Sequence, residues 1–499
     1  MISASIMPTS QKEAIYLLEK ALAQGDLAEL RIDLIQDLDI SEIGKRFDKN
    51  RIIVTNRKKE EGGLFEGSES ERVLPLIEAM EEGFGFIDIE ASSKENLETL
   101  ISKKFELNSK TNIISSYHNF KETPSTIKQI FDQMKNQGQD VIKIVGFAND
   151  ISDNLIIRQL INNAIADKKK IISFLMGEKG EISRILCNSW GSFTTYAPLN
   201  DQNNTAPGQV PLGILKDVYR ISSIKNDFDI FGLIGNPVKE SIGYYVHNKL
   251  FSYYDFNGIY LNFLVDDLSK FMNGFKGEFK GLCVTMPFKE QIMPYLDEVD
   301  EMALKIGAIN TIKKTNEGLF GTNTDWLGAL YSIEKVTKIK GKRVLILGAG
   351  GTGKAIAFGI ENNGGELMIS NRSRKKAEDL SKKIGAEIVP WEDRNDANFD
   401  ILVNATKIGM GTGRDDCPMD EKFFDKDLSG ITIFDAVYSP INTKLLQLSE
   451  KQGATVANGL DMYIGQAMAQ FELWTGIKPS IEKMEQLSKE ALKLRGGIT

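Results

Sequence analysis

The 499-residue sequence predicts an α/β protein in which an N-terminal (β/α)8 barrel is followed by a second, two-domain α/β unit. Two observations support this prediction. Short β-branched runs alternate with helical patterns through the first 200 residues or so, as in right-handed βαβ units. A glycine-rich turn near residue 350 joins an apolar strand to a helix, which indicates a nucleotide-binding fold. The length agrees with about three domains of roughly 150 residues each.

Eight runs in the first half have the length and composition of strands. Eight such strands within about 210 residues favour a small closed barrel over an open parallel sheet. The strands are expected at Ile2–Ile6, Leu27–Ile32, Arg51–Asn56, Gly85–Glu90, Asn112–His118, Val141–Phe147, Ile171–Met176 and Ser192–Ala197. The intervening helical patterns include Gln11–Gln24, Ser70–Glu82, Thr126–Asn136 and Ile156–Lys168.

Charged residues stand at or near the carboxyl ends of several of these strands, where the active sites of barrel enzymes are built. A parallel strand in a barrel is buried on both faces, so a charge within it is costly unless it has a partner or a purpose. Taken singly, each residue is explained as well by an ion pair or a satisfied core position. Together they predict a site, and they are Glu29, Arg31, Arg57, Glu90, His118 and Lys143.

The residue types point to one kind of chemistry. Lys143 lies in the apolar run Val141–Val145, where loss of hydration favours a neutral amine that attacks a ketone to form a Schiff base. A nearby histidine such as His118 can then move protons at the neighbouring carbons. Arginines in the same barrel can hold a carboxylate through paired donors.

Several segments of this half resemble type I 3-dehydroquinate dehydratase from residue 1 to about 217. They are Glu29–Arg31, Glu90, Ser115–Pro124, Lys143, Met176–Arg184 and Ala206–Gln209. The resemblance implies that Lys143 forms the Schiff base, that His118 is the general acid and base, and that Glu90 assists or orients His118. It also implies substrate contacts from Glu29, Arg31, Arg57, Arg184, Thr205 and Gln209, with Thr205 standing where the family commonly has serine.

The second half contains a dinucleotide-binding pattern. Lys342–Leu347 reads as an apolar strand, and Gly348-Ala349-Gly350-Gly351-Thr352-Gly353 leads from it into a helix. Such glycines let the backbone approach a pyrophosphate at a helix N-terminus, as in a Rossmann domain. We therefore expect domains at 1–217, at 228–327 completed by 460–499, and at 328–459 for the nucleotide.

The end of the next predicted strand indicates which nucleotide is bound. An acidic residue there binds the ribose hydroxyls of NAD. This chain instead has Asn371-Arg372-Ser373-Arg374, which suits the 2′-phosphate of NADP. The alternative is that these basic residues are only the solvated start of a helix.

Residues 228 to 499 also resemble one family, the shikimate dehydrogenases. The motifs that carry the resemblance include Gly235–Pro237, Ser241, His247-Asn248, Gly281–Lys289, Gly307–Thr311, Gly321–Asp325, Asn404–Thr406, Asp435–Pro440 and Gly459–Gln466. The family implies that Lys289 and Asp325 form the catalytic pair and that Ser241, Thr285, Asn310 and Gln466 bind the substrate. It implies NADP(H) contacts from the glycine-rich turn, from Asn371–Arg374, and from Asn404, Thr406, Val437, Tyr438, Gly459 and Met462. His247 is expected to be a core or capping residue.

Three positions depart from the family pattern. Gly243 stands where a second serine is usual beside Ser241, Glu240 where histidine is frequent, and Cys283 where asparagine or serine is frequent. A lost hydrogen bond to the carboxylate would cost roughly 1.5–3 kcal/mol. Gly243 is also expected to open room beside the carbon that bears the carboxylate, which would favour quinate as an alternative substrate.

Composition excludes other classes of protein. The net charge is −8, with 61 basic and 69 acidic side chains, which argues against nucleic-acid binding. No apolar run approaches the roughly 18 residues of a membrane span. Three dispersed cysteines and two histidines give no metal-site spacing, so no metal is expected. The N-terminal residues carry no targeting signal, which predicts a cytoplasmic protein.

The two resemblances predict consecutive enzymatic steps, because the product of the dehydratase is the substrate of the dehydrogenase. The expected partners are small molecules and NADP(H), and a monomer or homodimer is expected. Two alternatives stay open: a dehydratase fused to a quinate-preferring dehydrogenase, and a ligand-sensing regulator without turnover. A sensor would be expected to lose Lys143, His118, Lys289 or Asp325, and all four are present.

Overall fold

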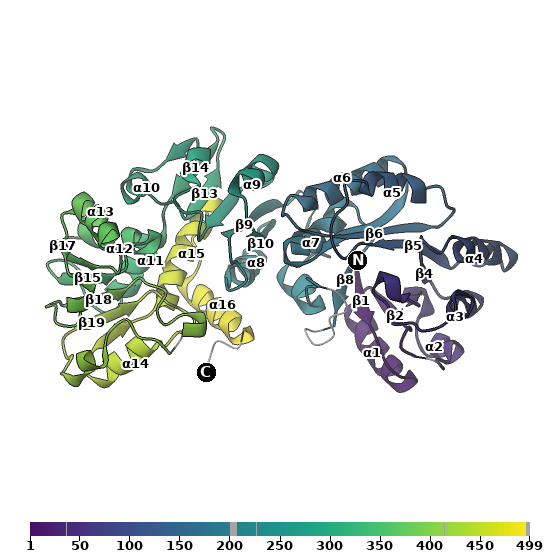
Figure 1. Cartoon of the computed structure of the whole chain (residues 1–499), viewed down its shortest axis with the longest axis horizontal. Coiled ribbons are helices and arrows are strands. Elements are labelled where there is room, and N and C mark those ends of the chain that lie inside the picture. The colour runs from purple at the N-terminus through teal and green to yellow at the C-terminus, as the bar shows by residue number, and fades with distance from the viewer. Residues whose placement is uncertain (36, 200–206, 226, 414, 496–499) are drawn as a thin grey trace. The chain divides into compact units, whose positions relative to one another are not determined.

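The computed structural model describes the chain except for residues 36, 200–206, 226, 414 and 496–499 (Figure 1). The chain divides into two compact units. The first comprises residues 1–228 with 263–276, and the second comprises residues 229–262 with 277–499.

The first unit contains a parallel eight-stranded sheet in the order β7-β6-β5-β4-β3-β2-β1-β8. Each neighbouring pair along this order is parallel, and β7 also contacts β8, so the sheet curls into a nearly closed barrel as predicted. The strands are β1 (Ile2–Ile6), β2 (Leu27–Arg31), β3 (Ile52–Thr55), β4 (Phe86–Glu90), β5 (Asn112–His118), β6 (Val141–Phe147), β7 (Lys170–Met176) and β8 (Thr195–Pro198).

Helices connect the barrel strands and present apolar faces to them. Local signals in the sequence fix where several of them begin: Ser10 caps the first helix, and Ser68 with Glu71 forms a capping box at the third. The helices are α1 (Gln11–Gln24), α2 (Ile40–Arg46), α3 (Glu69–Glu81), α4 (Lys94–Glu106), α5 (Ile127–Met134), α6 (Asp153–Ala166) and α7 (Glu181–Trp190). Buried residues of β5–β7, α5 and α6 form most of one continuous apolar cluster.

The second unit begins with a six-stranded mixed sheet in the order β10-β9-β11-β13-β14-β12. Its strands are β9 (Asp229–Gly235), β10 (Gly258–Leu264), β11 (Gly281–Val284), β12 (Glu298–Val299), β13 (Thr311–Lys314) and β14 (Leu319–Thr322). The helices of this part of the second unit are α8 (Gly243–Tyr253), α10 (Glu301–Ile306) and α11 (Asp325–Glu334), whereas α9 (Leu268–Phe275) belongs to the first unit.

A second sheet in this unit is entirely parallel, with strand order β17-β16-β15-β18-β19-β20. In chain order this is 3-2-1-4-5-6, the dinucleotide-binding topology that the glycine-rich turn predicts. The strands are β15 (Arg343–Leu347), β16 (Glu366–Ser370), β17 (Glu387–Ile388), β18 (Ile401–Asn404), β19 (Thr432–Asp435) and β20 (Thr455–Ala457). Three helices belong to it: α12 (Gly351–Asn362), α13 (Arg374–Ile384) and α14 (Lys444–Lys451).

Two C-terminal helices tie the two sheets of the second unit together. Helix α15 (Gly459–Thr475) packs against α11 and reaches β13, and α16 (Ile481–Leu494) packs against α8. Helices α15 and α16 therefore bring the C-terminal part of the chain back to the first sheet of this unit. The exact borders that the sequence predicts within this unit, at 327 and 459, stay an interpretation.

Candidate active sites

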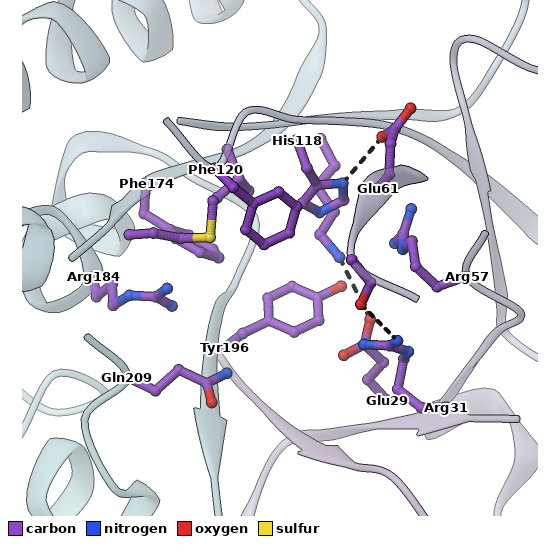
Figure 2. Close-up of a pocket in the computed structure, with 14 residues that line it drawn as sticks. Glu29, Arg31, Arg57, Glu61, His118, Phe120, Phe174, Arg184, Tyr196 and Gln209 are labelled. Carbon is purple, nitrogen blue, oxygen red and sulfur yellow. Dashed lines mark hydrogen bonds and ion pairs between the residues drawn. The ribbon is translucent and has the colours of Figure 1, made fainter. Parts of the chain in front are cut away.

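The barrel interior is polar at one level because alternate residues of parallel strands point inward. Strand register aligns Lys143 with Ser116 and places His118 two residues further along the same face of β5. Glu29 on β2 lies on the same interior face (Figure 2), as does Asp88 on β4. His118, Lys143 and Glu29 line a cavity that also includes Arg57, Glu61, Arg184, Tyr196 and Gln209, with about 500 Å³ of empty space that extends to open solvent.

Lys143 lies at the centre of this cavity and its side chain is only 5% exposed. Its Nζ is 3.1 Å from Asp88 Oδ2 and 3.4 Å from Glu29 Oε1, and it lies over the ring of Tyr196 at 4.1 Å from the centroid. The expectation of an apolar surrounding is therefore only half right. The strand around Lys143 is apolar and buried, but the amine itself meets two carboxylates that the alternation of β6 alone does not reveal.

Asp88 joins Lys143 to a second buried cation. Arg57 donates from Nη2 to Asp88 Oδ1 at 2.8 Å and from Nη1 to Ser116 Oγ at 2.6 Å. Burial alone would raise the pKa of Asp88, but the charges of Arg57 and Lys143 hold it well below its usual range. Asp88 is thus an ionised counter-charge in the site, and sequence reasoning missed it. Its position two residues before Glu90 on the same strand face was the available signal.

His118 is kept neutral by its surroundings. Burial, followed by the charges of Arg57 and Lys143, holds the pKa of its imidazole well below the ordinary value. A neutral imidazole can accept a proton at neutral pH, which is what a general base requires.

The carboxylate beside His118 is Glu61, and this corrects the expectation for Glu90. Glu61 Oε2 is 3.4 Å from His118 Nδ1, while Glu90 is held 2.7 Å from Arg72 Nη1 and accepts from the backbone N–H of Lys58 at 2.9 Å. Glu90 also lies 3.4 Å from Arg57 Nη1, so its carboxylate balances the charges of two buried guanidiniums. Glu61 lies four residues after Arg57 on the loop that follows β3, and that proximity could have indicated it.

The predicted substrate-binding residues of the barrel fall into two groups. Arg31 is already engaged, with Nε and Nη2 each 2.7 Å from the carboxylate oxygens of Asp33. Arg184 stacks on Phe174 at 4.6 Å and donates to the carbonyl of Pro207, and its buried Nε has no partner among the described residues. Burial lowers the pKa of Arg184 to about 10. An under-satisfied buried guanidinium on a cavity wall suits a ligand carboxylate. Gln209 lines the same cavity, and Thr205 lies outside the described residues.

The second unit holds a lysine–aspartate pair as expected. Lys289 Nζ and Asp325 Oδ2 are in contact, and Asp325 Oδ1 accepts from Asn310 Nδ2 at 2.7 Å. The amide of Asn310 also reaches Gln466 Oε1 at 3.4 Å. These four residues come from the loop after β11, the start of β13, the N-terminus of α11 and helix α15, and they line one cavity of about 1060 Å³.

The same cavity contains Ser241 and Thr285, but not the extra room expected at Gly243. A Cβ at Gly243 would lie 3.1 Å from Ser241 Oγ and 3.1 Å from the Tyr260 hydroxyl. The tyrosine therefore fills the space that the missing serine leaves. This removes the structural support for quinate preference, because the added hydroxyl of quinate would need that space.

Two further lining residues are buried and uncharged. His247 stacks on Tyr260 with centroids 4.6 Å apart, and burial lowers its pKa to about 3. The thiol of Cys283 donates to Gln470 Oε1 at 3.1 Å, and burial raises its pKa to about 12. Neither group is charged near neutral pH, and His247 agrees with the core role expected for it.

The glycine-rich turn has the geometry that a pyrophosphate requires. Gly348 has a φ of +110°, and a Cβ at Gly353 would lie 2.1 Å from the carbonyl oxygen of Gly348. Gly350 caps α12 without a side-chain hydrogen bond, and no atom lies within 4 Å of where its Cβ would stand. The amides at the start of α12 therefore face free space and can bind an anion. Thr352 lines the cavity that holds Lys289 and Asp325.

The other predicted cofactor residues divide into structural and exposed ones. Asn371 Oδ1 accepts from the N–H of Ala349, while buried Asn404 bonds Thr406 and Asp435 and so shapes the loop. Tyr438, Gly459 and Met462 line the catalytic cavity, and Val437 is buried beside them. Beyond β16, the exposed Arg372 lies over Trp391 at 5.6 Å, and Arg374 pairs with Glu378 at 3.0 Å. Ser373 is the N-cap residue of α13. The residues present fit a dinucleotide with a 2′-phosphate.

Two further findings concern membrane-spanning helices and clusters of metal-binding side chains among the described residues. No helix within the described ranges has the length and apolar character to cross a membrane. In the same ranges, no group of three or more His, Cys, Asp or Glu side chains is placed to hold a metal ion.

The folds and sites together define a two-site enzyme, with a lysine-centred barrel and a dinucleotide-dependent dehydrogenase on one chain. Family models agree. The model of type I 3-dehydroquinase matches residues 2–226. Models of the shikimate dehydrogenase substrate-binding domain, of shikimate/quinate 5-dehydrogenase and of the shikimate 5′-dehydrogenase C-terminal domain match residues 233–312, 332–409 and 459–487.

Individual relatives cover either the whole chain or its second half. The bifunctional 3-dehydroquinate dehydratase/shikimate dehydrogenase of Arabidopsis thaliana, a chloroplastic protein, is 34% identical over 96% of this chain and 82% of its own length. An NADP(+) shikimate dehydrogenase of Pyrococcus abyssi is 39% identical over 53% of this chain and 98% of its own. The crystal structure of shikimate dehydrogenase from Aquifex aeolicus matches with a TM-score of 0.50 and 34% identity, over 53% of this chain and 98% of that one. The chain belongs to the family of bifunctional 3-dehydroquinate dehydratases/shikimate dehydrogenases.

Proposed function

We propose that this chain catalyses two consecutive reactions of the shikimate pathway, which leads to chorismate and the aromatic amino acids. The barrel dehydrates 3-dehydroquinate to 3-dehydroshikimate, and the second unit reduces 3-dehydroshikimate to shikimate with NADPH. The observation that carries the proposal is that one chain holds both a buried lysine beside a neutral histidine and a lysine–aspartate pair beside a nucleotide fold.

The first reaction starts at Lys143. Attack on the ketone needs a neutral amine, so its proton passes first to a neighbouring base. Glu29, 3.4 Å away, suits this better than Asp88, which Arg57 also binds. The nitrogen then bonds to the ketone carbon, and loss of one water gives an iminium.

His118 carries the next proton transfers. As a neutral base it removes a proton from the carbon next to the iminium, and the resulting enamine expels the β-hydroxyl, which leaves as water with a proton from His118. Hydrolysis of the new conjugated iminium releases the product and restores Lys143. Glu61 holds the imidazole from Nδ1, and Arg184 is the group that suits the substrate carboxylate.

The second reaction uses a cofactor that the chain must bind and orient. NADPH, when bound, supplies the hydride to the ketone carbon. Lys289 donates the proton to the oxygen of that carbon, with Asp325 holding the amine in place. Asn310, Thr285 and Gln466 bind the adjoining hydroxyls, and Ser241 binds the carboxylate; all four line the same cavity as Lys289 and Asp325.

Two assays on the purified chain test the proposal. Addition of 3-dehydroquinate alone should produce the ultraviolet absorbance of a conjugated enone, and addition of NADPH should then remove that absorbance as NADPH is oxidised. Binding of either ligand without turnover would support the regulator alternative and contradict the proposal. Cytoplasmic location, the absence of nucleic-acid partners and a monomeric or homodimeric state stay predictions from the sequence.

A further inference from the structure

One polar atom in the dehydratase cavity has no role in the steps above. The hydroxyl of Tyr196 is buried, and the residue as a whole is 3% exposed. Within the described parts of the chain this hydroxyl has no hydrogen-bond partner. The ring lines the cavity, and Figure 2 shows the hydroxyl directed toward the side of the cavity where Glu29 and Arg57 lie.

A buried hydroxyl without a partner is costly, by about 1–3 kcal/mol. The two carboxylates on this side already have partners: Glu29 bonds Ser5 and Thr55 as well as Lys143, and Asp88 bonds Arg57 and Ser116. Strand register sets Tyr196 opposite Ser3 on β1, so the ring faces the barrel interior rather than the helices. An unsatisfied donor on a cavity wall indicates a ligand atom that completes it.

The position of the ring relative to Lys143 identifies that atom. Nζ lies 4.1 Å from the ring centroid, and the hydroxyl projects from the same ring. When Nζ bonds to the ketone carbon, the oxygen of that carbon is held within two covalent bonds of Nζ. This oxygen is therefore held close to the ring that carries the phenol hydroxyl.

We propose that Tyr196 is a catalytic residue of the dehydratase that donates a hydrogen bond to the substrate oxygen on the carbon attacked by Lys143. The inference rests on the proposed dehydratase function and adds a group to it. Burial, together with the charges of Glu29 and Asp88, raises the pKa of Tyr196 well above its ordinary value. The phenol therefore keeps its proton and acts as a donor.

The step balances without any added reactant. The lone pair of Nζ forms the C–N bond, and the π pair of the C=O bond moves onto oxygen, where the phenol stabilises the developing negative charge. One proton of the nitrogen passes to this oxygen through His118, which gives the neutral carbinolamine. The proton that Glu29 took from Lys143 at the start then passes to this oxygen, which leaves as water, and the iminium forms. Tyr196 donates again to the leaving oxygen and is unchanged at the end.

The decisive variant is Tyr196→Phe, which removes one oxygen atom and leaves the ring over Lys143. The expected result is a fall of about 10²-fold in dehydratase kcat, the size seen when one donor to a developing oxyanion is lost. KM should change little, because the interaction strengthens in the transition state. The rate at which borohydride traps the Lys143 adduct in a single turnover should fall by a similar factor.

Two controls separate this role from a structural one. Tyr117→Phe removes a hydroxyl from the residue next to His118. Because neighbouring residues of a strand face opposite sides, Tyr117 faces away from the barrel interior, and this variant should leave the trapping rate unchanged. Shikimate dehydrogenase activity, carried by the second unit of the same chain, should be equal in all three proteins and reports that each is folded.

The outcomes are distinguishable. Failure of the wild-type chain to form a trapped adduct at Lys143 would remove the proposed dehydratase function itself. A wild-type adduct with an equal trapping rate in Tyr196→Phe would overturn only the inference. A raised KM with unchanged kcat would also overturn it, because it would make Tyr196 a ground-state contact.

Discussion

Both sites of this chain are suited to a reaction at a ketone carbon, but they differ in how many charged side chains surround the lysine. The barrel cavity places Lys143, Arg57, Asp88 and Glu29 within one buried network, with a neutral His118 at its edge. The dehydrogenase cavity is larger, and its lysine–aspartate pair is accompanied by Glu240 and by uncharged residues such as Cys283 and His247.

The difference in charge follows from the source of the reactive group, which is a lysine of the protein in the barrel and a bound nucleotide in the dehydrogenase. A lyase that works through its own lysine must hold and move several protons inside the protein, so it needs buried counter-charges to keep each group in its required state. A dehydrogenase receives its reducing power from a bound nucleotide. Its protein groups need only to donate one proton and to hold two ligands in register.

The sharpest test of this comparison is removal of the barrel lysine. Lys143→Ala should lower the rate of 3-dehydroquinate dehydration by about 10⁴-fold or more, as expected for the loss of a nucleophile. Reduction of 3-dehydroshikimate by the same protein should be unchanged. Both rates are measured separately by enone absorbance and NADPH oxidation. A joint loss of both activities would mean that the two sites are not independent.

The converse variant is expected to have a smaller effect. Lys289→Ala should lower the reduction rate by about 10²- to 10⁴-fold, because a bound cofactor and substrate are still brought together when the proton donor is missing. Dehydration of 3-dehydroquinate should continue at the wild-type rate, with enone accumulating in the presence of NADPH. Wild-type reduction in this variant would contradict the role of Lys289.

The cofactor preference should depend on an exposed arginine. Arg372→Ala should raise the KM for NADPH by about 10- to 100-fold, since a hydrogen bond to a charged group contributes about 1.5–3 kcal/mol. The KM for NADH should stay the same. Lys382→Ala, at the far end of α13, removes an equal charge and is the matched control. Equal NADPH affinity in wild type and Arg372→Ala would leave the 2′-phosphate without its expected partner.

The smallest effect concerns the pH dependence of dehydration. His118 acts as a base in its neutral form, and its pKa is held below the ordinary value of about 6.5. Activity is lost only as the pH falls through the lowered pKa, so the acid limb of kcat/KM should have its midpoint below 6.5. A limb centred at or above 6.5 would show that burial and the two cations do not control this imidazole.

The sequence predicted elements better than contacts. Strands β1, β5 and β6 and helix α1 have the expected bounds, because β-branched runs and the Ser10 cap are local signals. Glu90 was assigned to His118 through the resemblance to type I 3-dehydroquinate dehydratase. Its actual partner, Arg72, comes from a helix 18 residues earlier in the chain, and no local pattern joins them.

Two other errors share this cause. The polar neighbours of Lys143 are Glu29 of β2 and Asp88 of β4, on other strands of the barrel. The apolar residues next to Lys143 in the sequence of β6 therefore gave a wrong prediction of its surroundings. The space at Gly243 is closed by Tyr260, a residue from the following strand. The fold class can be predicted from local sequence patterns, whereas the contacts between side chains depend on tertiary packing.

Covalent bonding of the substrate to Lys143 is the central claim, and one measurement tests it directly. The whole chain is incubated with 3-dehydroquinate, reduced with borohydride, digested and mapped by mass spectrometry. The account predicts a single reduced adduct on the peptide that contains Lys143, with none when substrate is omitted. An adduct on a different lysine, or turnover without any trapped adduct, would contradict it.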